Sequence, residues 1–357
     1  MTIPPGTVAL ADYARLAAAR WPQDVRAYID GAGADGITAA ANLTAWGAIR
    51  LRGRVLADLR GASTSLSLLG LDLAHPILLA PVAYHGQVHP DAEAATALGA
   101  AAGQALMVVS TQSGLPLERI AADAQGPLWF QLYLQARRDD SLHLIRRAED
   151  AGYRALVLTV DAPVNGLRND EARAGFSLPP GLGAVNLAGY HQPQFTPPPG
   201  RSAAFLGMLD HAPRWEDLAW LRAQTRLPIL LKGICDPGDA ARAVDLGVDG
   251  VIVSNHGGRA LDSLPATAEI LPAIAARVGD RVPVICDGGI RRGTDVLKAL
   301  ALGARAVMVG RPQLHALAIG GAAGVAHMLT ILRAELEVAM ALTGCCDLDA
   351  VDAGVLW

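Results

Sequence analysis

The sequence has 357 residues, which exceeds the usual length of one domain but suits a single α/β barrel. Hydrophobic residues make up 52% of the chain and charged residues 18%, a composition that excludes intrinsic disorder. The formal net charge of −4 provides no broad positive field for nucleic acid or an anionic membrane, so we expect neither as a partner. The expected partner is a small molecule.

The cysteines and the N-terminal residues predict a cytoplasmic protein. Cys235 and Cys286 lie at or near the ends of apolar runs, Cys345 and Cys346 lie near the C-terminus, and no metal-ligand spacing occurs. We therefore expect reduced thiols and no metal site. Residues 1–16 lack a basic segment followed by an apolar one, and Arg, Asp, Gly or Pro interrupts every long apolar stretch. The sequence thus predicts neither a signal peptide nor a membrane span.

From residue 75 onward, short apolar runs rich in β-branched residues alternate with longer Ala- and Leu-rich amphipathic segments. Continuous apolar runs of this length are typical of strands that are buried on both faces of a parallel sheet. The predicted strands are 75–82, 106–111, 128–134, 155–162, 228–233, 250–257, 283–289 and 306–312. The segments between them are predicted to be helical, including 141–151, 236–246 and 294–302, the last with Thr294 as its N-cap.

This alternation of strands and helices predicts a (β/α)8 TIM barrel rather than an open doubly wound sheet. An open sheet would usually carry a Gly-rich dinucleotide turn after its first strand, where this sequence reads PVAYHG. Residues 1–74 are predicted to form an N-terminal helical extension, which the polar link 60–69 joins to the barrel at 75–357. The Pro- and Gly-rich segment 173–213 follows the fourth strand, and we expect a mobile lid there rather than a spacer.

Polar side chains follow the predicted strands at the end where TIM barrels carry their active sites. Each residue alone would be read as structural, but their convergence on one barrel mouth predicts a functional site. In the segment VSNHGGRALD, His256 can move a proton and Arg259 can bind an anion, although both can also be turn residues. The full set is Gln131, Tyr133, Thr159, Asp161, Arg168, Lys232, His256, Arg259 and Asp287.

The last two loops, DGGIRRGTD at 287–295 and VGRP at 309–312, have the composition of a phosphate site. Glycine N–H groups and a helix N-terminus bind phosphate in these loops of many barrels, and Arg291 and Arg311 would add positive charge. The alternative is a pair of ordinary Gly turns with solvated arginines. Lys232 ends a buried run and needs an anionic or electron-rich partner, such as a flavin ring. Its alternative role is that of the Schiff-base lysine of an aldolase.

Six segments of the chain form a characteristic set: SNHGGRALD, LKG, FQLY, LTVDAPVNGLR, DGGIRRGTDVLKALALGA and VGRP. The stretch of chain that shares this character extends from 19–33 to 340–345. Together the six segments resemble the FMN-dependent α-hydroxy acid oxidase/dehydrogenase family. This family includes glycolate and lactate oxidases, mandelate dehydrogenases and 4-hydroxymandelate oxidases. The resemblance implies an FMN-binding barrel that oxidises an (S)-2-hydroxy acid to the 2-oxo acid.

The resemblance also implies roles for the matching positions. His256 matches the catalytic base, and Asp161 matches the acid that pairs with this histidine. Arg168 and Arg259 match the arginines that bind the substrate carboxylate, a planar anion that suits two forked donors. The tyrosines expected at the substrate are Tyr28, Tyr84 and Tyr133. Tyr133 is also expected to take part in catalysis, together with His256 and Asp161. The residues expected at the FMN are Val82, Ala83, Ser110, Gln131, Thr159, Lys232, Ser254, Asp287, Gly289, Arg291, Gly310 and Arg311.

Leu167, Gln112 and Ala260 depart from the commonest family pattern, and they concern the substrate pocket rather than the base or the arginines. Tyr84 and the mandelate-like VNGLR favour an aromatic or medium aliphatic substrate, with lactate or glycolate as the alternative. Because 173–213 has few aliphatic clusters, we expect O2 as electron acceptor rather than a membrane quinone or another carrier. The remaining alternative is a non-catalytic flavoprotein. The resemblance further implies a homo-oligomer, often a tetramer.

Overall fold

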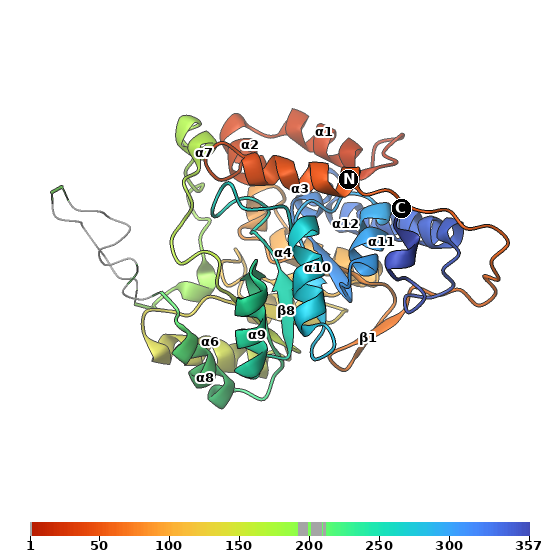
Figure 1. Ribbon diagram of the computed structural model, residues 1–357. Coiled ribbons are helices and arrows are strands. Elements are labelled where there is room, and N and C mark those ends of the chain that lie inside the picture. Colours follow the sequence, from red (N-terminus) through yellow and green to blue (C-terminus); the bar gives the residue numbers. More distant parts are fainter. Residues whose placement is uncertain (1, 192–198, 201–208, 210–211) are drawn as a thin grey trace.

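The computed structural model describes residues 2–191, 199–200, 209 and 212–357. Eight parallel strands follow one another around a closed barrel, and the last strand pairs with the first, which confirms the predicted TIM barrel (Figure 1). Every residue of these eight strands except Gly233 is buried, as the apolar runs predict. The strands are β3 (Ile77–Leu79), β4 (Met107–Val109), β5 (Leu128–Leu132), β6 (Leu156–Thr159), β7 (Ile229–Ile234), β8 (Gly250–Val253), β9 (Val284–Cys286) and β10 (Ala306–Val309).

Each barrel strand is followed by a helix, so the strands run in parallel and their carboxyl ends meet at one mouth. These helices are α4 (Ala92–Ala102), α5 (Leu117–Asp123), α6 (Arg138–Asp150), α8 (Trp215–Gln224), α9 (Pro237–Asp245), α10 (Thr267–Val278), α11 (Gly293–Ala301) and α12 (Arg311–Thr343). The short helix α7 (Asn169–Arg173) precedes α8 in the connection after β6. Single 3-10 turns are η1 (His85–Gln87), η2 (Val185–Leu187) and η5 (Ala353–Val355).

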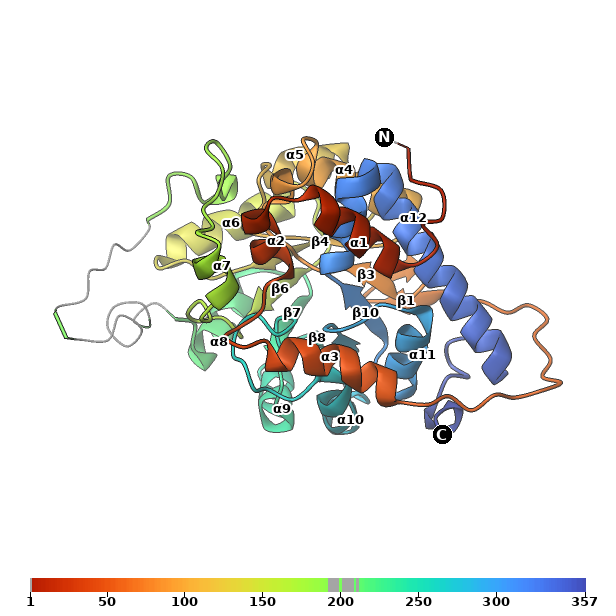
Figure 2. The same cartoon turned by 90° about the horizontal axis from the view of Figure 1, so that it is seen from above.

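Three helices precede the barrel: α1 (Leu10–Arg20), α2 (Gln23–Asp30) and α3 (Ile37–Ala48). Figures 1 and 2 show them together over one end of the barrel, and Tyr28 of α2 lines the cavity at that mouth. The helix α1 packs against α12, where the Tyr13 hydroxyl lies 2.8 Å from His327 Nδ1. The N-terminal extension therefore has a direct part in the site.

A hairpin at the end of the link 60–69 was not predicted: β1 (Leu66–Leu68) pairs antiparallel with β2 (Leu71–Leu73). One local prediction is wrong. Helix α11 begins at Gly293, so Thr294 is not its N-cap. Instead the carboxylate of Asp295 reaches back and accepts hydrogen bonds from the backbone N–H groups of residues 291 and 292, both at 3.0 Å. An acidic side chain in the first turn satisfies N–H groups that have no partner within the helix.

Helix α12 is long and apolar enough to cross a bilayer by length and composition alone. In this fold, however, 72% of its most apolar window is buried, and the helix packs against α1, α4 and α11. Its apolar character is therefore that of a core helix. The backbone leaves helical geometry at Gly321, where two helical segments meet at a kink.

Part of the predicted lid 173–213 lies outside the described residues, and part is packed on the barrel. Asn186 is buried: its Oδ1 accepts a hydrogen bond from Leu117 N at 2.9 Å, and its Nδ2 donates to Ser113 Oγ at 2.7 Å. These bonds fix η2 beside the loop that follows β4. Movement of the segment stays a prediction.

Candidate functional site

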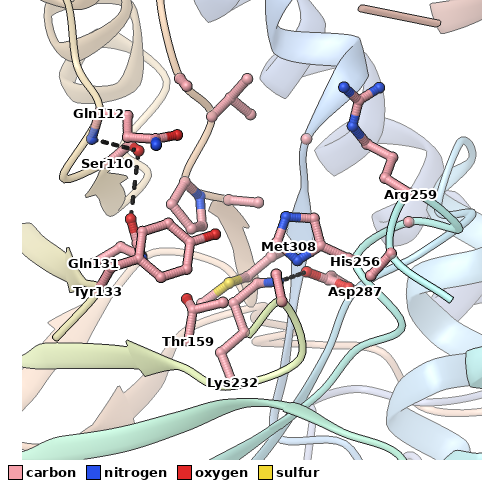
Figure 3. A pocket seen from close by; sticks show the side chains of 18 of the residues that line it. Ser110, Gln112, Gln131, Tyr133, Thr159, Lys232, His256, Arg259, Asp287 and Met308 are labelled. Carbon is pink, nitrogen blue, oxygen red and sulfur yellow. Dashed lines mark hydrogen bonds and ion pairs between the residues drawn. The ribbon is translucent and has the colours of Figure 1, made fainter. Parts of the chain in front are cut away.

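A cavity of about 420 Å³ lies at the carboxyl ends of the strands. Its lining includes residues from each of the eight barrel strands or the turns that follow them, together with Tyr28 and Ile29 of α2. Figure 3 shows His256, Lys232, Asp287, Thr159 and Tyr133 gathered around this space. The predicted site residues that line the cavity are Tyr28, Val82, Ala83, Ser110, Gln131, Tyr133, Thr159, Arg168, Lys232, His256, Arg259, Asp287, Gly289, Arg291, Gly310 and Arg311.

Three predicted site residues do not line this cavity but lie close to residues that do. Asp161 and Ser254 contact His256 and Lys232, as described below. Tyr84 lies beside Tyr28, with 6.5 Å between the ring centroids. The structure therefore brings all the predicted site residues to one end of the barrel. Residues that served only as parts of separate turns would not be expected to gather in this way.

His256 and Asp161 form a close polar pair at this end of the barrel. His256 Nδ1 lies 2.9 Å from Asp161 Oδ1, and the other ring nitrogen of His256 is left for a ligand. The backbone N–H of His256 donates to Ser254 Oγ at 3.1 Å, which fixes the turn after β8. Burial alone would raise the pKa of Asp161, but the charge and the hydrogen bond of His256, together with Lys232, lower it. Asp161 is thus an anion that can stabilise a protonated imidazole.

Gly233 allows Asp161 to take this position. It has a φ of +104°, and a Cβ placed on it would lie 2.5 Å from both the Cβ and the Cγ of Asp161. Only glycine accommodates such a backbone and such a close approach. The glycine of the LKG motif therefore has a specific role beside the paired carboxylate.

Lys232 is buried at the end of β7 and has two polar partners. Its Nζ donates to Ser254 Oγ at 2.9 Å and lies 3.2 Å from Asp287 Oδ2. Burial would lower the pKa of Lys232, but Asp287, Asp161 and Tyr133 raise it above its usual value. The amine is therefore held as a cation, whereas a Schiff-base lysine must be neutral to attack a carbonyl. This geometry opposes the aldolase alternative.

Arg168 and Arg259 lie together on another side of the cavity. One carboxylate oxygen, Glu171 Oε1, accepts from Arg168 Nη1 at 3.0 Å and from Arg259 Nη2 at 3.2 Å. The Arg259 guanidinium also lies over the ring of Tyr28, 5.4 Å from its centroid. Burial, followed by the charges of Arg168 and Arg311, lowers the pKa of Arg259 to about 10. Two neighbouring guanidinium groups in this setting favour an anionic ligand.

Arg291 and Arg311 lie at the predicted phosphate end of the cavity. Arg311 Nη2 donates to the carbonyl of Gly31 at 2.8 Å, and its Nη1 donates to the carbonyl of Gly257 at 3.0 Å. Arg291 also lines the cavity and lies just before α11 in the chain. Burial, followed by the charge of Arg291, lowers the pKa of Arg311 to about 10. These arginines are not the solvated side chains of the alternative interpretation.

Four buried polar atoms of residues that line the cavity lack a hydrogen-bond partner among the described residues: Gln131 Nε2, Thr159 Oγ1, Arg168 Nε and Asp287 Oδ1. Gln131 Oε1 is already bound by Ser110 Oγ at 3.3 Å and by Thr111 N at 3.1 Å, so its amide group is held in one orientation. Buried polar atoms normally have partners, and a ligand with both donors and acceptors would supply them. Together with the cationic Lys232 and the arginines at the phosphate end, this donor set fits FMN.

The histidines outside this site have other roles. His85, which follows the first barrel strand, is buried, and its Nδ1 lies 2.8 Å from Thr96 Oγ1. Its backbone N–H donates to the buried carboxylate of Glu93 at 3.0 Å, which makes it a structural residue. Among the described residues, no group of three His, Cys, Asp or Glu side chains is arranged to hold a metal ion.

Glu171 and Phe176 are site residues that the sequence did not reveal. Glu171 contacts both Arg168 and Arg259, and Phe176 stacks on Tyr28 with 4.5 Å between ring centroids and 18° between ring planes. Both follow the fourth strand closely, in the stretch NDEARAGF. The one available signal was this proximity to Arg168, because an acidic residue three positions along a helix can reach it.

Comparisons with known proteins agree with this site. The model of the family described as FMN-dependent dehydrogenase matches residues 17–357. An L-lactate oxidase of Alicycliphilus denitrificans is 50% identical over 351 residues, 98% of this chain and 96% of that protein. A peroxisomal (S)-2-hydroxy-acid oxidase of Oryza sativa is 44% identical over 338 residues, 95% of this chain and 92% of that protein. A structure of mandelate oxidase with (S)-2-phenylpropionate has a TM-score of 0.88 and 41% identity, with 98% of both chains covered.

Proposed function

The chain belongs to the FMN-dependent dehydrogenase family, and from this premise we propose that it oxidises an (S)-2-hydroxy acid to the 2-oxo acid while reducing O2 to hydrogen peroxide. One observation carries the proposal: the His256–Asp161 pair and the two arginines Arg168 and Arg259 serve the same cavity. This cavity therefore combines a base with a site for a carboxylate. A 2-hydroxy acid is a small molecule that needs both.

The arginines bind and orient the substrate. Arg168 and Arg259 present guanidinium donors to the carboxylate, and Tyr28 lies against Arg259 where its hydroxyl can assist. Burial raises the pKa of Tyr133 to about 12, so this phenol stays protonated and can donate a hydrogen bond to the substrate. Binding at these residues places the carbon that carries the hydroxyl group near His256.

His256 accepts a proton from the substrate through the ring nitrogen that does not face Asp161. The proton comes from the hydroxyl group or from C2, and the structure is compatible with both routes. The negative charge of Asp161 stabilises the imidazolium that results. FMN, when bound, takes up the two electrons that leave the substrate. Gln131, Thr159, Lys232 and the residues of the last two loops would hold it.

The size of the substrate is part of the proposal. The sequence favours an aromatic or medium aliphatic side chain, and the aromatic rings of Tyr28, Tyr84 and Phe176 agree with that choice. The comparisons favour lactate over mandelate. The relatives of 46–50% identity are called L-lactate oxidases, whereas the mandelate oxidase structures are 40–41% identical to this chain. We therefore propose (S)-lactate as the preferred substrate over (S)-mandelate.

An anaerobic screen tests the proposal. The FMN-loaded protein is mixed with (S)-lactate, (S)-mandelate or glycolate, and bleaching of the flavin absorbance is followed before air is readmitted. We expect bleaching by (S)-lactate at the lowest concentration and one hydrogen peroxide for each substrate oxidised. No bleaching by any 2-hydroxy acid contradicts the proposed reaction, whereas bleaching without peroxide on readmission of air indicates a dehydrogenase.

A substitution of the base completes this test. His256→Ala should keep the yellow colour of bound FMN and lose about 10²–10⁴-fold in turnover, because general base catalysis by a positioned side chain is lost. Near-normal turnover would reject His256 as the base.

The cellular setting is a separate proposal. All four cysteines are described and free, which supports a reducing compartment such as the cytoplasm. We also propose a homo-oligomer, a tetramer by its family resemblance. Cell fractionation and light scattering of the purified FMN-loaded protein test these two statements.

A further inference from the structure

The carboxylate of Glu171 joins the two arginines that are assigned to the substrate. The same oxygen, Oε1, accepts from Arg168 at 3.0 Å and from Arg259 at 3.2 Å, and the Glu171 side chain is only 17% exposed. Arg168 precedes α7, and Arg259 follows β8, so two distant parts of the barrel meet at one oxygen atom. The ion pair of Arg168 with Glu171 is the only one found for Arg168 among the described residues.

Glu171 contacts these arginines but is not part of the lining of the cavity. Arg168 and Arg259 both line the cavity. Arg259 Nη1 is also occupied, since it donates to the backbone carbonyl of Gly31 at 2.8 Å. Arg168 Nε, in contrast, is buried without a hydrogen-bond partner among the described residues, so this donor is available to an anion in the cavity.

The charges at this place need a counterion. Arg168 and Arg311 are so close to Arg259 that the positive charges of both lower its pKa. Like charges in a poorly hydrated environment repel each other strongly. Glu171 raises that same pKa, and it is the carboxylate in direct contact with two of the three guanidinium groups.

The segment that carries Glu171 is itself anchored. Asn169 Nδ2 donates to the carbonyl of Ala34 at 3.3 Å, and Ala34 N donates to the carbonyl of Leu167 at 2.6 Å. On the other side of Glu171, Phe176 stacks on Tyr28. These contacts tie both ends of the segment 167–176 to the N-terminal extension and hold the carboxylate in place.

We propose that Glu171 is a positioning residue for substrate binding: it holds the guanidinium groups of Arg168 and Arg259 side by side against their mutual repulsion, so that both face one carboxylate. The inference rests on the proposed function, because it assigns the two arginines to a 2-hydroxy acid. Without Glu171, Arg168 loses its ion-pair partner and the arginines separate. The expected consequence is weaker binding of the acid, with little change in the chemical step.

Steady-state kinetics of FMN-loaded variants with (S)-lactate and (S)-mandelate test this inference. Glu171→Gln keeps the size of the side chain and removes its charge, and we expect it to raise KM at least tenfold while kcat changes less than threefold. The matched control is Asp170→Asn on the same helix, where an exposed carboxylate pairs with the exposed Arg173. The control should leave KM within twofold of the parent. Titration with pyruvate, followed by flavin absorbance, should show the same loss of affinity in Glu171→Gln.

The direction of the change in KM decides the outcome. An unchanged KM in Glu171→Gln overturns the inference, and a lowered KM would show that Glu171 competes with the substrate for the arginines. If Glu171→Gln does not fold, Glu171→Asp decides, because its shorter side chain keeps the charge but cannot span both arginines, and KM should still rise threefold or more. A parent protein that oxidises no 2-hydroxy acid rejects the proposed function instead, so the two failures are distinct.

Discussion

Replacing Asp161 by asparagine tests how the catalytic pair works. The substitution keeps the size and shape of the side chain beside Gly233, and it removes the negative charge that lies 2.9 Å from His256 Nδ1. The neutral amide can also turn an N–H group toward the imidazole, which disfavours the tautomer that accepts a proton from the substrate. Both changes weaken the state in which His256 carries the extra proton.

The magnitude follows from the geometry of the pair. Two unit charges about 4 Å apart attract each other by about 4 kcal/mol at an effective dielectric constant of about 20. The His256 side chain is 24% exposed, so water screens part of this attraction. We therefore expect a loss of about 3 kcal/mol in the stabilisation of the transition state, which corresponds to a decrease of about 10²-fold in the rate of flavin reduction.

The assay is anaerobic flavin reduction in a stopped-flow instrument, which separates substrate oxidation from the reaction with O2. The control variant is Asp58→Asn, whose carboxylate is exposed and pairs with Arg60 in the N-terminal extension. A double variant with His256→Ala adds a stricter condition. Because Asp161 acts through His256, Asp161→Asn should slow the His256→Ala protein by less than threefold.

Two results would refute this reasoning. A decrease of less than fivefold in Asp161→Asn would mean that the charge has little part in proton uptake. A full effect of Asp161→Asn in the His256→Ala background would mean that the carboxylate acts on something other than the histidine.

Three further predictions concern the same barrel mouth. Gly233→Ala forces a Cβ against Asp161, and we expect it to slow flavin reduction at least as much as Asp161→Asn while FMN stays bound; normal reduction by this variant would contradict the proposed packing. Lys232→Met leaves Asp287 buried without its cation, so the free energy of unfolding in urea should fall by about 3–5 kcal/mol, and an unchanged midpoint would argue against the ion pair. Burial lowers the pKa of His85 below its ordinary value of 6.5, so the unfolded chain takes up a proton that the folded chain does not. The stabilisation from a neutral His85 should therefore be fully present above about pH 6.5 and be lost as the pH falls through the folded pKa. Between about pH 7.5 and 5.5, the melting temperature should decrease less for His85→Asn than for the parent protein.

The barrel was predictable because its signals are local. Seven of the eight predicted ranges contain an observed barrel strand, and β7 extends one residue beyond the eighth, since largely apolar runs of this length are typical of strands buried on both faces. The polar residues after those runs, such as Lys232 and His256, were then placed by topology, because the carboxyl ends of parallel strands in a barrel meet. Neither step needed a knowledge of tertiary contacts.

Some local signals were present but were not used. The stretch LSLLGLDL alternates apolar and polar residues on either side of Leu69 and Gly70, and both of these residues have positive φ angles in the structure. Such a two-residue connection is a common signal for a hairpin, and it explains β1 and β2. At α11, Asp295 was available as a cap, but Thr294 has the residue type that more often occupies the N-cap position.

Other features depend on contacts between distant segments and could not be predicted from the sequence. Asp170 and Glu171 are neighbouring acidic residues on one short helix, yet the first is exposed and the second is held between two arginines. The pairing of Glu171 with Arg168 is local, but its second partner, Arg259, is brought to this helix by the turn after β8. The same applies to Gly31, whose carbonyl accepts hydrogen bonds from both Arg259 and Arg311.

That shared carbonyl has a consequence for how such enzymes can be recombined. A chimera that joins the N-terminal residues of one relative to the barrel of another would separate Gly31 from the two arginines with which its backbone is matched. Exchange of the barrel alone should therefore impair substrate and cofactor binding together, even if every side chain in the cavity is retained. Residues 28–34 and the turn at 256–262 must therefore be taken from the same parent protein, although more than 200 residues of chain lie between them.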